Sequence, residues 1–348
     1  MPIQVVVADI DRDLDTFVAL LNRNREHRVD RRRFEWLYLN NPRGKAKAWL
    51  VIDEKTQQTV AFTVVLPRMF RVEGREEICW NCSDFSVDKK YRTLGVALKL
   101  RRQAKEGVER GESAALYAHP NDRMKVIHEK VGHTAIGFMQ RYVKLLRIDK
   151  HLERVVTNRV LTRLVAPVVN LGLKMLDGST RLEKKYTIEI LGNAEFDQEY
   201  DCLFEDAAKH YTVLGDRTAA FLNWRFVDCP LYNTERIIIR EDGKLIGFII
   251  FFEDDGIAVL KDVLCQPDEK IIKALLAQWV KHLRQRNIRS ISAILMNSNP
   301  LLGILRKHGF RSRPEVSSVF GYTPDDRELS SFWLQGNDWY MTVGDRDV

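Results

Sequence analysis

The stretch "VDKKYRTLGVALKL", Val87 to Leu100, decides how the first part of the chain is interpreted. It places Arg92, Gly95 and Ala97 just before a pattern that predicts an amphipathic helix. The first amides of a helix carry the positive end of its dipole and bind phosphate oxygens where no bulky side chain intervenes. Gly95 and Ala97 leave that backbone accessible, and the Arg92 guanidinium can add a bidentate contact. The stretch therefore predicts a phosphate site.

The motif R-x-x-G-x-A is short enough to arise by chance, and a glycine near a helix start is also tolerated without any ligand. Its position strengthens the prediction, because the strand-like run Ile78 to Val87 precedes it and the helical run Leu94 to Arg110 follows it. The motif therefore lies at a strand-to-helix junction, which is the position expected for a phosphate site at a helix start.

Length and composition indicate a globular protein with well-packed hydrophobic cores. The chain has 348 residues, of which 45% are hydrophobic, enough for two packed domains. Apolar runs such as Leu245 to Phe252 have the length of strands, so we predict no membrane-spanning helix. The start "MPIQVVVADIDRDLD" turns acidic early and does not resemble a signal peptide, so we expect a cytoplasmic protein.

Charge and cysteine usage exclude several classes of function. The net charge of +7 favours an anionic partner, but the basic residues are spread along the chain, and we expect no nucleic acid. Five cysteines at irregular spacing predict free thiols rather than disulfides. Cys79 and Cys82 form a CxxC in a strand-like segment, where their side chains would point to opposite faces, so we predict no metal site.

The chain repeats itself. The segment from Trp36 to Pro42 matches the segment from Trp224 to Pro230, and each precedes a strand, a polar turn and a second strand. Further along, "DFSV" and "HEKVGH" of the first copy match "DVLC" and "LRKHGF" of the second at nearly the same offset. We therefore predict a diverged tandem duplication.

Both copies follow the order helix, strand pair, long strand, long helix, strand, short helix and final strand, which predicts an α+β fold with mixed sheets flanked by helices. For the first copy, the expected elements cover residues 14–23, 48–71, 78–87, 94–110, 113–118, 123–131 and 135–145. The predicted organisation is a domain over 1–145, a helical connector over 146–193 that is broken at Pro167 and Gly178, a second domain over 194–322 and a tail over 323–348. A membrane-surface role for the connector is the less favoured alternative.

The segment "FSVDKKYRTLGVALKL", followed by "AALYAHPNDRMKVIHEKVGHTAIGF", resembles the acyl-CoA-binding half of the GNAT superfamily of N-acyltransferases. The resemblance covers about Val60 to Val143, and the repeat extends it to the second copy. It implies two GNAT-like domains and acyl-CoA, most often acetyl-CoA, as co-substrate. The implied cofactor-binding residues are Phe85, Val87, Arg92, Thr93, Leu94, Gly95, Val96, Ala97 and Asn121.

The resemblance also implies a position for the acid that protonates the departing thiolate. Many relatives have a tyrosine there, whereas this chain has His128, which equally suits a buried structural histidine. Asp84 is the candidate general base, because it is the carboxylate expected nearest the acyl carbon. Asp262 matches it in the second copy, so a structural role is equally open. His119 and Asn121 are expected at the tip of the next strand, and Asn121 also suits a helix cap.

The second copy lacks the residues that the loop needs. Lys270, Lys273 and Leu275 stand where the first copy has Arg92, Gly95 and Ala97, so we expect acyl-CoA to bind only the first copy. The tail is expected to pack by its aromatic residues with Asp338, Asp345 and Asp347 in water. The alternative is that the tail folds back over the cleft and these carboxylates have a substrate role.

The predicted function is acyl transfer to an amine or hydroxyl of a bulky acceptor such as an amino sugar. Two alternatives remain open from the residues and the resemblance. One is a non-catalytic acyl-CoA-binding module, and the other is an aminoacyl-tRNA-dependent transferase similar to the Fem type, which also has two such domains.

Overall fold

The computed structural model describes residues 2–92, 94–149, 159–175, 177 and 183–347. The first copy forms β1 (Ile3–Val7), α1 (Leu14–Asn24), α2 (Arg31–Phe34), β2 (Lys47–Asp53), β3 (Thr59–Val72), β4 (Arg75–Val87), α3 (Leu94–Glu109), β5 (Ala115–Ala118), α4 (Asp122–Lys130) and β6 (Thr134–Leu145). These bounds confirm the expected elements of this copy and add β1 at the sheet edge.

The second copy repeats this order. After α6 (Arg159–Met175) come β7 (Tyr186–Leu191), α7 (Gln198–Ala208), β8 (Val213–Gly215), α8 (Ala219–Leu222), β9 (Glu235–Glu241), β10 (Lys244–Asp254), β11 (Ile257–Cys265), α9 (Glu269–Gln285), β12 (Ser290–Met296), α10 (Leu301–Lys307) and β13 (Arg311–Tyr322). The tail adds α11 (Ser330–Leu334) and β14 (Trp339–Tyr340). The predicted tandem duplication is thus confirmed, with the short helices α4 and α10 each followed by a left-handed glycine, Gly132 and Gly309.

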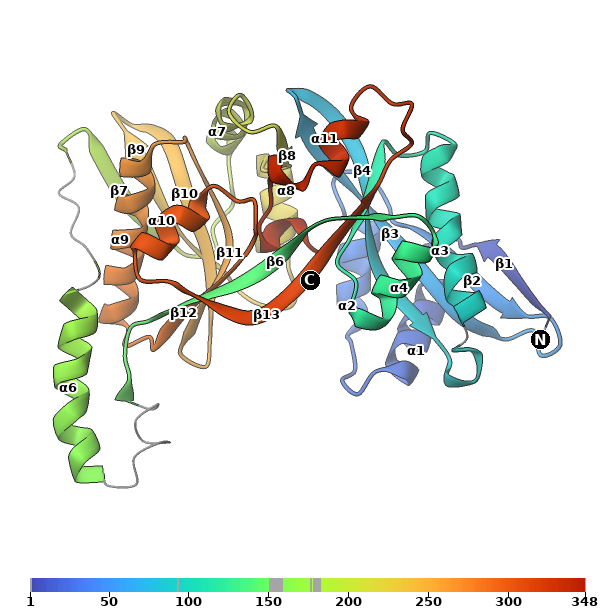
Figure 1. The fold of residues 1–348 in the computed structure, drawn as a ribbon, viewed down its shortest axis with the longest axis horizontal. Coiled ribbons are helices and arrows are strands. Elements are labelled where there is room, and N and C mark those ends of the chain that lie inside the picture. Colours follow the sequence, from blue (N-terminus) through green and yellow to red (C-terminus); the bar gives the residue numbers. More distant parts are fainter. Residues whose placement is uncertain (1, 93, 150–158, 176, 178–182, 348) are drawn as a thin grey trace.

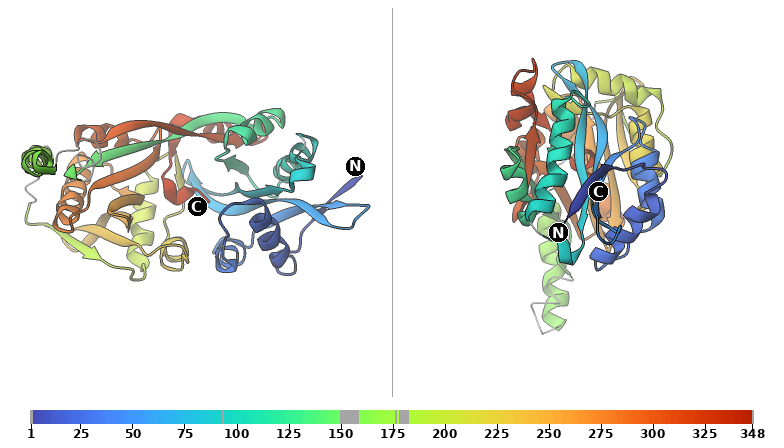
Figure 2. Two further views of the ribbon diagram at one scale, coloured as in Figure 1. Left: turned by 90° about the horizontal axis from the view of Figure 1, so that it is seen from below. Right: turned by 90° about the vertical axis from the view of Figure 1, so that its right-hand side faces the viewer.

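The two copies exchange their last strands. The sheet runs in the order β1-β2-β3-β4-β5-β13-β6-β12-β11-β10-β9-β7. The last strand of the second copy, β13, pairs with β5 of the first, and β6 of the first copy pairs with β12 of the second. Figures 1 and 2 show β6 and β13 running between the halves. The first copy, expected to end in its own sheet at residue 145, instead completes the sheet of the second.

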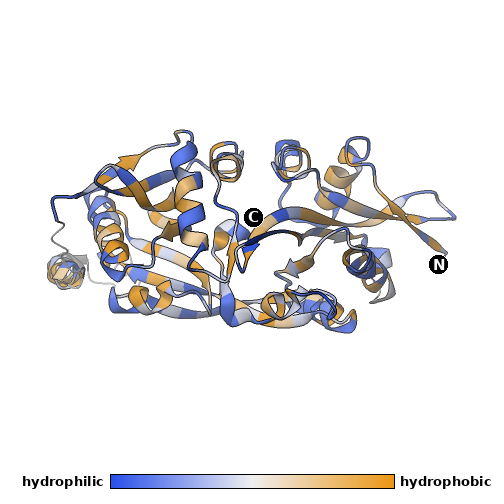
Figure 3. Cartoon of the chain, turned by 90° about the horizontal axis from the view of Figure 1, so that it is seen from above, coloured by the Kyte–Doolittle hydropathy of each residue, from blue (hydrophilic) through white to orange (hydrophobic). Residues whose placement is uncertain are grey.

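A symmetric junction joins the halves on one face of the sheet. The indole of Trp36 donates a hydrogen bond to the backbone oxygen of Trp224 at 2.6 Å, and the indole of Trp224 donates to the oxygen of Trp36 at 2.8 Å. One hydrophobic cluster extends through both halves around this pair. The flanking helices carry both hydrophobic and hydrophilic positions (Figure 3), as expected for helices with one face on a sheet.

Two expectations about the connector were wrong. Pro167 lies inside α6 rather than breaking it, because a proline removes one hydrogen bond without always ending a helix. The expected helical segment also ends in β7, which pairs with β9 at the sheet edge, as β1 pairs with β2 at the other edge. Gly178 lies outside the described residues. Among the described residues, no helix is long and apolar enough to cross a membrane.

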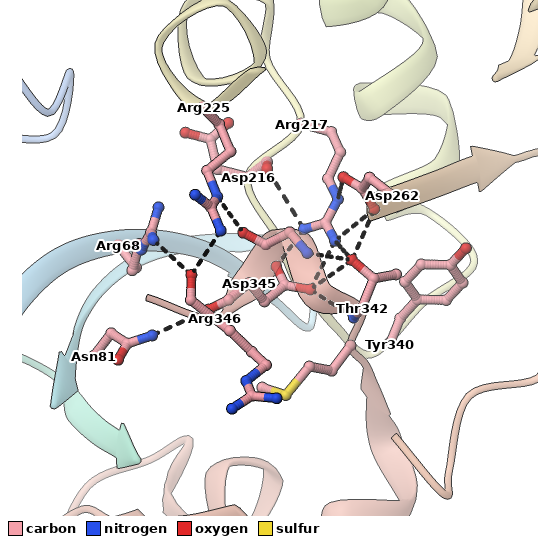
Figure 4. A network of polar contacts seen from close by, with 12 residues as sticks. Arg68, Asn81, Asp216, Arg217, Arg225, Asp262, Tyr340, Thr342, Asp345 and Arg346 are labelled. Atoms are coloured by element: carbon pink, nitrogen blue, oxygen red, sulfur yellow. Dashed lines mark hydrogen bonds and ion pairs between the residues drawn. The ribbon is translucent and has the colours of Figure 1, made fainter. Parts of the chain in front are cut away.

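The tail also differs from expectation. Its aromatic residues Trp339 and Tyr340 are buried, as predicted, but Asp345 is buried as well and pairs with the fully buried Arg217. Arg217 also pairs with Asp262 of β11, and this network, drawn in Figure 4, fixes the tail between the halves. The carboxylate of Asp345 lies in the interior because a buried guanidinium requires a counter-charge.

Candidate acyl-CoA cleft

The candidate site lies where two parallel strands of the first half diverge. β4 and β5 pair only from Cys79 and Ala115 to Cys82 and Ala118, after which β4 continues to Val87 paired with β3 on one side only. At the point of divergence, the pairing of β4 with β3 changes register, so that Ser83 and Asp84 together oppose one residue of β3. Such a bulge leaves an extra residue outside the ladder and is frequent beside active sites. The strand edge beyond it is free to pair with an extended ligand.

Two adjoining cavities form a cleft beside this edge. The outer cavity has a volume of about 560 Å³ and the inner cavity about 230 Å³. They share four lining residues, Arg25, Phe85, Asn121 and Met124. A larger cavity of about 850 Å³ between α6 and α9 contains none of the predicted site residues.

The structure brings most of the predicted cofactor-binding residues to the outer cavity. Those that line it are Phe85, Val87, Arg92, Ala97 and Asn121. Gly95 is exposed on the same helix start, and no atom lies within 4 Å of the position that a Cβ would take. Val96 points into the core instead. Thr93 and the side chain of Leu94 lie outside the described residues.

Arg92 is held at the rim of the cleft. Its Nε donates to the Val87 oxygen and its Nη2 to the Asn24 side chain, both at 3.0 Å. These contacts fix the guanidinium beside the start of α3. Arg123 of α4 and Arg25 line the same cavity, which is therefore rich in cations that can contact a phosphate.

The N-terminus of α4 closes the other side of the cleft. The Asn121 side chain accepts a hydrogen bond from the Met124 amide at 3.1 Å, and therefore caps α4 while lining both cavities. The capping interpretation of Asn121 is confirmed.

His128 is buried and lines the inner cavity. Its Nδ1 lies 2.7 Å from Nδ1 of His133, so one of the two rings must donate to the other. Burial, Arg101 and His133 lower the pKa of His128 well below its usual value, and burial lowers that of His133 to about 3. Both rings are therefore neutral at pH 7. When His133 donates, His128 keeps its proton on Nε2 as a hydrogen-bond donor.

Asp84 is tightly paired. Its carboxylate accepts hydrogen bonds from Arg33 at 2.6 Å, from Tyr38 at 2.7 Å and from Arg25 at 3.2 Å. Burial alone would raise the pKa of Asp84, but the cations, Arg33 first, lower it below the ordinary value. A carboxylate with these partners is a weak base, and the geometry favours a role in holding Arg25 and Arg33.

Three further charged residues reach the inner cavity. Arg25 and Arg101 were not predicted as site residues, and Asp347 was considered only for the case that the tail folds over the cleft. Arg101 comes from α3, Arg25 from the segment after α1, and Asp347 from the tail. Asp347 accepts a hydrogen bond from the Ser83 hydroxyl at 3.4 Å. His119, considered for this tip from the sequence, also lines the cavity. The contact of Asp347 joins residues far apart in the chain, so no local pattern could have indicated it.

The corresponding gap of the second half is filled by the tail. β11 and β12 pair only over residues 257–259 and 290–292 before they diverge. Thr342 forms a bridge with Leu295 in this gap, and the Tyr340 hydroxyl donates to the Val263 oxygen at 2.6 Å. In addition, the Asp268 side chain caps the start of α9, and Leu275 is buried. The open cleft is therefore found in the first half.

Comparison with known proteins supports the fold. No model of a known protein family and no curated protein matches this sequence. Solved structures do resemble it. A GCN5-related N-acetyltransferase from Anabaena variabilis has 13% identity and a TM-score of 0.67, and the match covers 92% of this chain and 73% of that protein. A tandem GNAT protein from the clavulanic acid biosynthesis pathway has 13% identity and a TM-score of 0.56. The match covers 93% of this chain and 100% of that protein.

A third similar structure is the Saccharomyces cerevisiae N-myristoyltransferase with bound myristoyl-CoA. It has 13% identity and a TM-score of 0.57, over 100% of this chain and 84% of its own. At these identities the likeness concerns the fold, and the fold of this chain is the tandem, two-domain fold of the GNAT superfamily.

Proposed function

We propose that this chain is an acyl-CoA-dependent acyltransferase that transfers a short acyl group to an amine or hydroxyl, with the reaction in the cleft of the first half. The observation that carries the proposal is the cleft itself. It joins an open helix start at Gly95, a free strand edge beyond Cys82 and a bulge at Ser83 and Asp84. Each of these fits one part of acyl-CoA.

The residues suit the cofactor in order along the cleft. The amides at the start of α3, with Arg92 and Arg123, would hold the pyrophosphate. The edge of β4 from Phe85 to Val87 would pair with the amides of the pantetheine arm. When bound, acyl-CoA supplies an activated thioester, whose carbonyl oxygen a backbone amide at the bulge would stabilise.

Two side chains of the inner cavity are placed to handle protons. The neutral His128 would donate a hydrogen bond from Nε2 to the departing sulfur. Asp347, whose contact at the bulge is the Ser83 hydroxyl, could accept the proton of the attacking amine. Asp84 would orient Arg25 and Arg33 beside them.

The first test is Gly95→Glu. We expect this variant to fold normally, because nothing lies within 4 Å of the new Cβ, yet to bind coenzyme A at least tenfold more weakly through repulsion of the phosphates. Titration calorimetry should give one site in the parent chain. The control is Gly303→Glu in α10, where the space is also open. A second site that survives Gly95→Glu would place cofactor binding in the other half.

The second test is His128→Phe. Cofactor affinity should stay within about twofold, while turnover falls about 100-fold, the low end expected for losing an acid–base group. Turnover is followed as free thiol released from acetyl-CoA, with and without amine acceptors. Unchanged turnover combined with a lower melting temperature would make His128 a core residue only. A chain that binds coenzyme A but releases no thiol would be a binding module.

A further inference from the structure

Arg101 is buried in the cleft with unused hydrogen-bond donors. It comes from the second turn of α3, its side chain lines the inner cavity, and the residue is only 3% exposed. Its Nη2 makes a long contact of 3.5 Å to the Ser83 oxygen, and its guanidinium lies over the Phe85 ring at 5.3 Å. Nε and Nη1 are buried and have no hydrogen-bond partner among the described residues.

The neighbouring carboxylates do not neutralise it. Among the described residues, no carboxylate lies within ion-pairing distance of Arg101, since Asp84 pairs with Arg25 and Arg33. A buried guanidinium without a counter-ion is costly, and leaving two of its donors unsatisfied adds to that cost. The second half has no such residue, because α9 presents the buried apolar side chains Trp279 and Val280 on its inward face. Trp279 stands at the position equivalent to Arg101, so the packing of this helix on the sheet does not itself require a cation there.

The rest of the cavity is also polar. Both ring nitrogens of His119 are buried without a partner in the part of the chain that the structure describes. Burial, with a smaller effect of Arg346, lowers the pKa of His119 well below its usual value, so this ring is neutral. A long aliphatic chain placed here would remove water from these groups without replacing its hydrogen bonds. A small group that accepts several hydrogen bonds can satisfy the free donors of Arg101 and the N–H of His119.

We propose that Arg101 forms a carboxylate-binding subsite at the inner end of the cleft, and that the transferred acyl group carries a terminal carboxylate, as in malonyl- or succinyl-CoA. This inference rests on the proposed function. The acyl side is favoured because Arg101 stands one helical turn after Ala97, which lines the cofactor part of the cleft. Arg101 and His119 together offer donors on two sides of a cavity of about 230 Å³, the size of a short acyl chain. The same chemistry could instead bind a carboxylate of the acceptor.

Binding by the full chain tests the acyl source. Coenzyme A, acetyl-CoA, malonyl-CoA and succinyl-CoA are titrated into the parent protein, Arg101→Met, Arg101→Lys and Arg102→Met. Arg102 is the exposed next residue and serves as the matched control. We expect the parent and Arg102→Met to bind a dicarboxylic acyl-CoA at least tenfold more tightly than acetyl-CoA. Arg101→Met should lose this preference and keep its affinity for coenzyme A, with Arg101→Lys intermediate.

A second arm distinguishes the acceptor source. With acetyl-CoA as donor, glycine and ethanolamine are compared as amine acceptors that differ in the carboxylate. A preference for glycine that disappears in Arg101→Met, without any preference among the acyl-CoAs, assigns the carboxylate to the acceptor. Coenzyme A binding without either preference overturns the subsite alone. Failure of the parent to bind coenzyme A overturns the proposed function and the subsite with it.

Discussion

Arg217→Met should lower the free energy of unfolding by about 3–5 kcal/mol, because it leaves two buried carboxylates without their cation. Arg217 and Asp262 are fully buried and Asp345 nearly so. The guanidinium lies 3.0 Å from Asp262 and 2.7 Å from the Oδ2 of Asp345 (Figure 4). Burial already raises the pKa of Asp262, and the charge of Asp345 raises it further. Without Arg217, at least one of the two must take up a proton or move toward water.

The same variant should also disturb the cleft of the first half. Asp345 anchors the tail, and Asp347 two residues later reaches Ser83 at the bulge. Loosening the anchor therefore displaces a residue of the inner cavity, and turnover should fall along with stability. Arg217 lies on the loop before α8, outside the proposed cofactor contacts, so coenzyme A affinity should change less than turnover.

Equilibrium unfolding by urea, followed by tryptophan fluorescence, measures the effect. The control is Arg12→Met, whose side chain is 72% exposed in its pair with Asp13 and whose loss should leave the stability nearly unchanged. A loss below about 1 kcal/mol for Arg217→Met would show that the tail is not held by this network.

Local patterns predicted the elements well, and for a physical reason. Apolar periodicity and helix-ending glycines depend on residues that are close in the chain, so the bounds of α3, β4 and α4 agree with expectation. The repeat around Trp36 and Trp224 showed the duplication directly. The first turn of α3 could be proposed for cofactor binding from the sequence because its residues are neighbours in the chain.

The strand exchange could not be predicted in this way. β6 and β13 are equivalent in the repeat, so each has a pattern compatible with either half of the sheet. The direction that the chain takes in space after α4 and after α10 decides which half of the sheet β6 and β13 join. The same holds for the tail, since the pairing of Asp345 with Arg217 joins residues that are far apart in the chain. A lone arginine in an amphipathic helix, such as Arg101, likewise resembles a surface residue until its burial is known.

Lys261→Met should have the opposite effect to Arg217→Met and stabilise the protein at pH 7. Lys261 lies at a bulge of β11, is 7% exposed, and its ammonium is 4.1 Å from the centre of the Tyr232 ring. No carboxylate lies within ion-pairing distance of it among the described residues. Burial, followed by the charge of Arg225, lowers the pKa of Lys261 to about 7.

The sign of the effect follows from the protons bound in each state. With a folded pKa near 7 and an ordinary value of 10.5, the folded chain holds fewer protons than the unfolded chain between these limits. Stability therefore rises with pH across this window, and the full cost of the lysine is felt below pH 7. A shift of this size corresponds to about 5 kcal/mol. We expect Lys261→Met, which keeps the apolar stem, to recover about 2–4 kcal/mol at pH 7. Relaxation of the surroundings and residual water reduce the cost of the buried charge below its full value.

Urea unfolding at several pH values between 7 and 9.5 measures both parts of this prediction. The parent should gain stability across that range, whereas Lys261→Met should be more stable at pH 7 and show a flatter dependence. Lys244→Met is the control, because its ammonium is largely exposed and pairs with Asp206, so its removal should change stability by less than about 0.5 kcal/mol. A loss of stability at pH 7 in Lys261→Met would mean that the contact with the Tyr232 ring outweighs the cost of burying the charge.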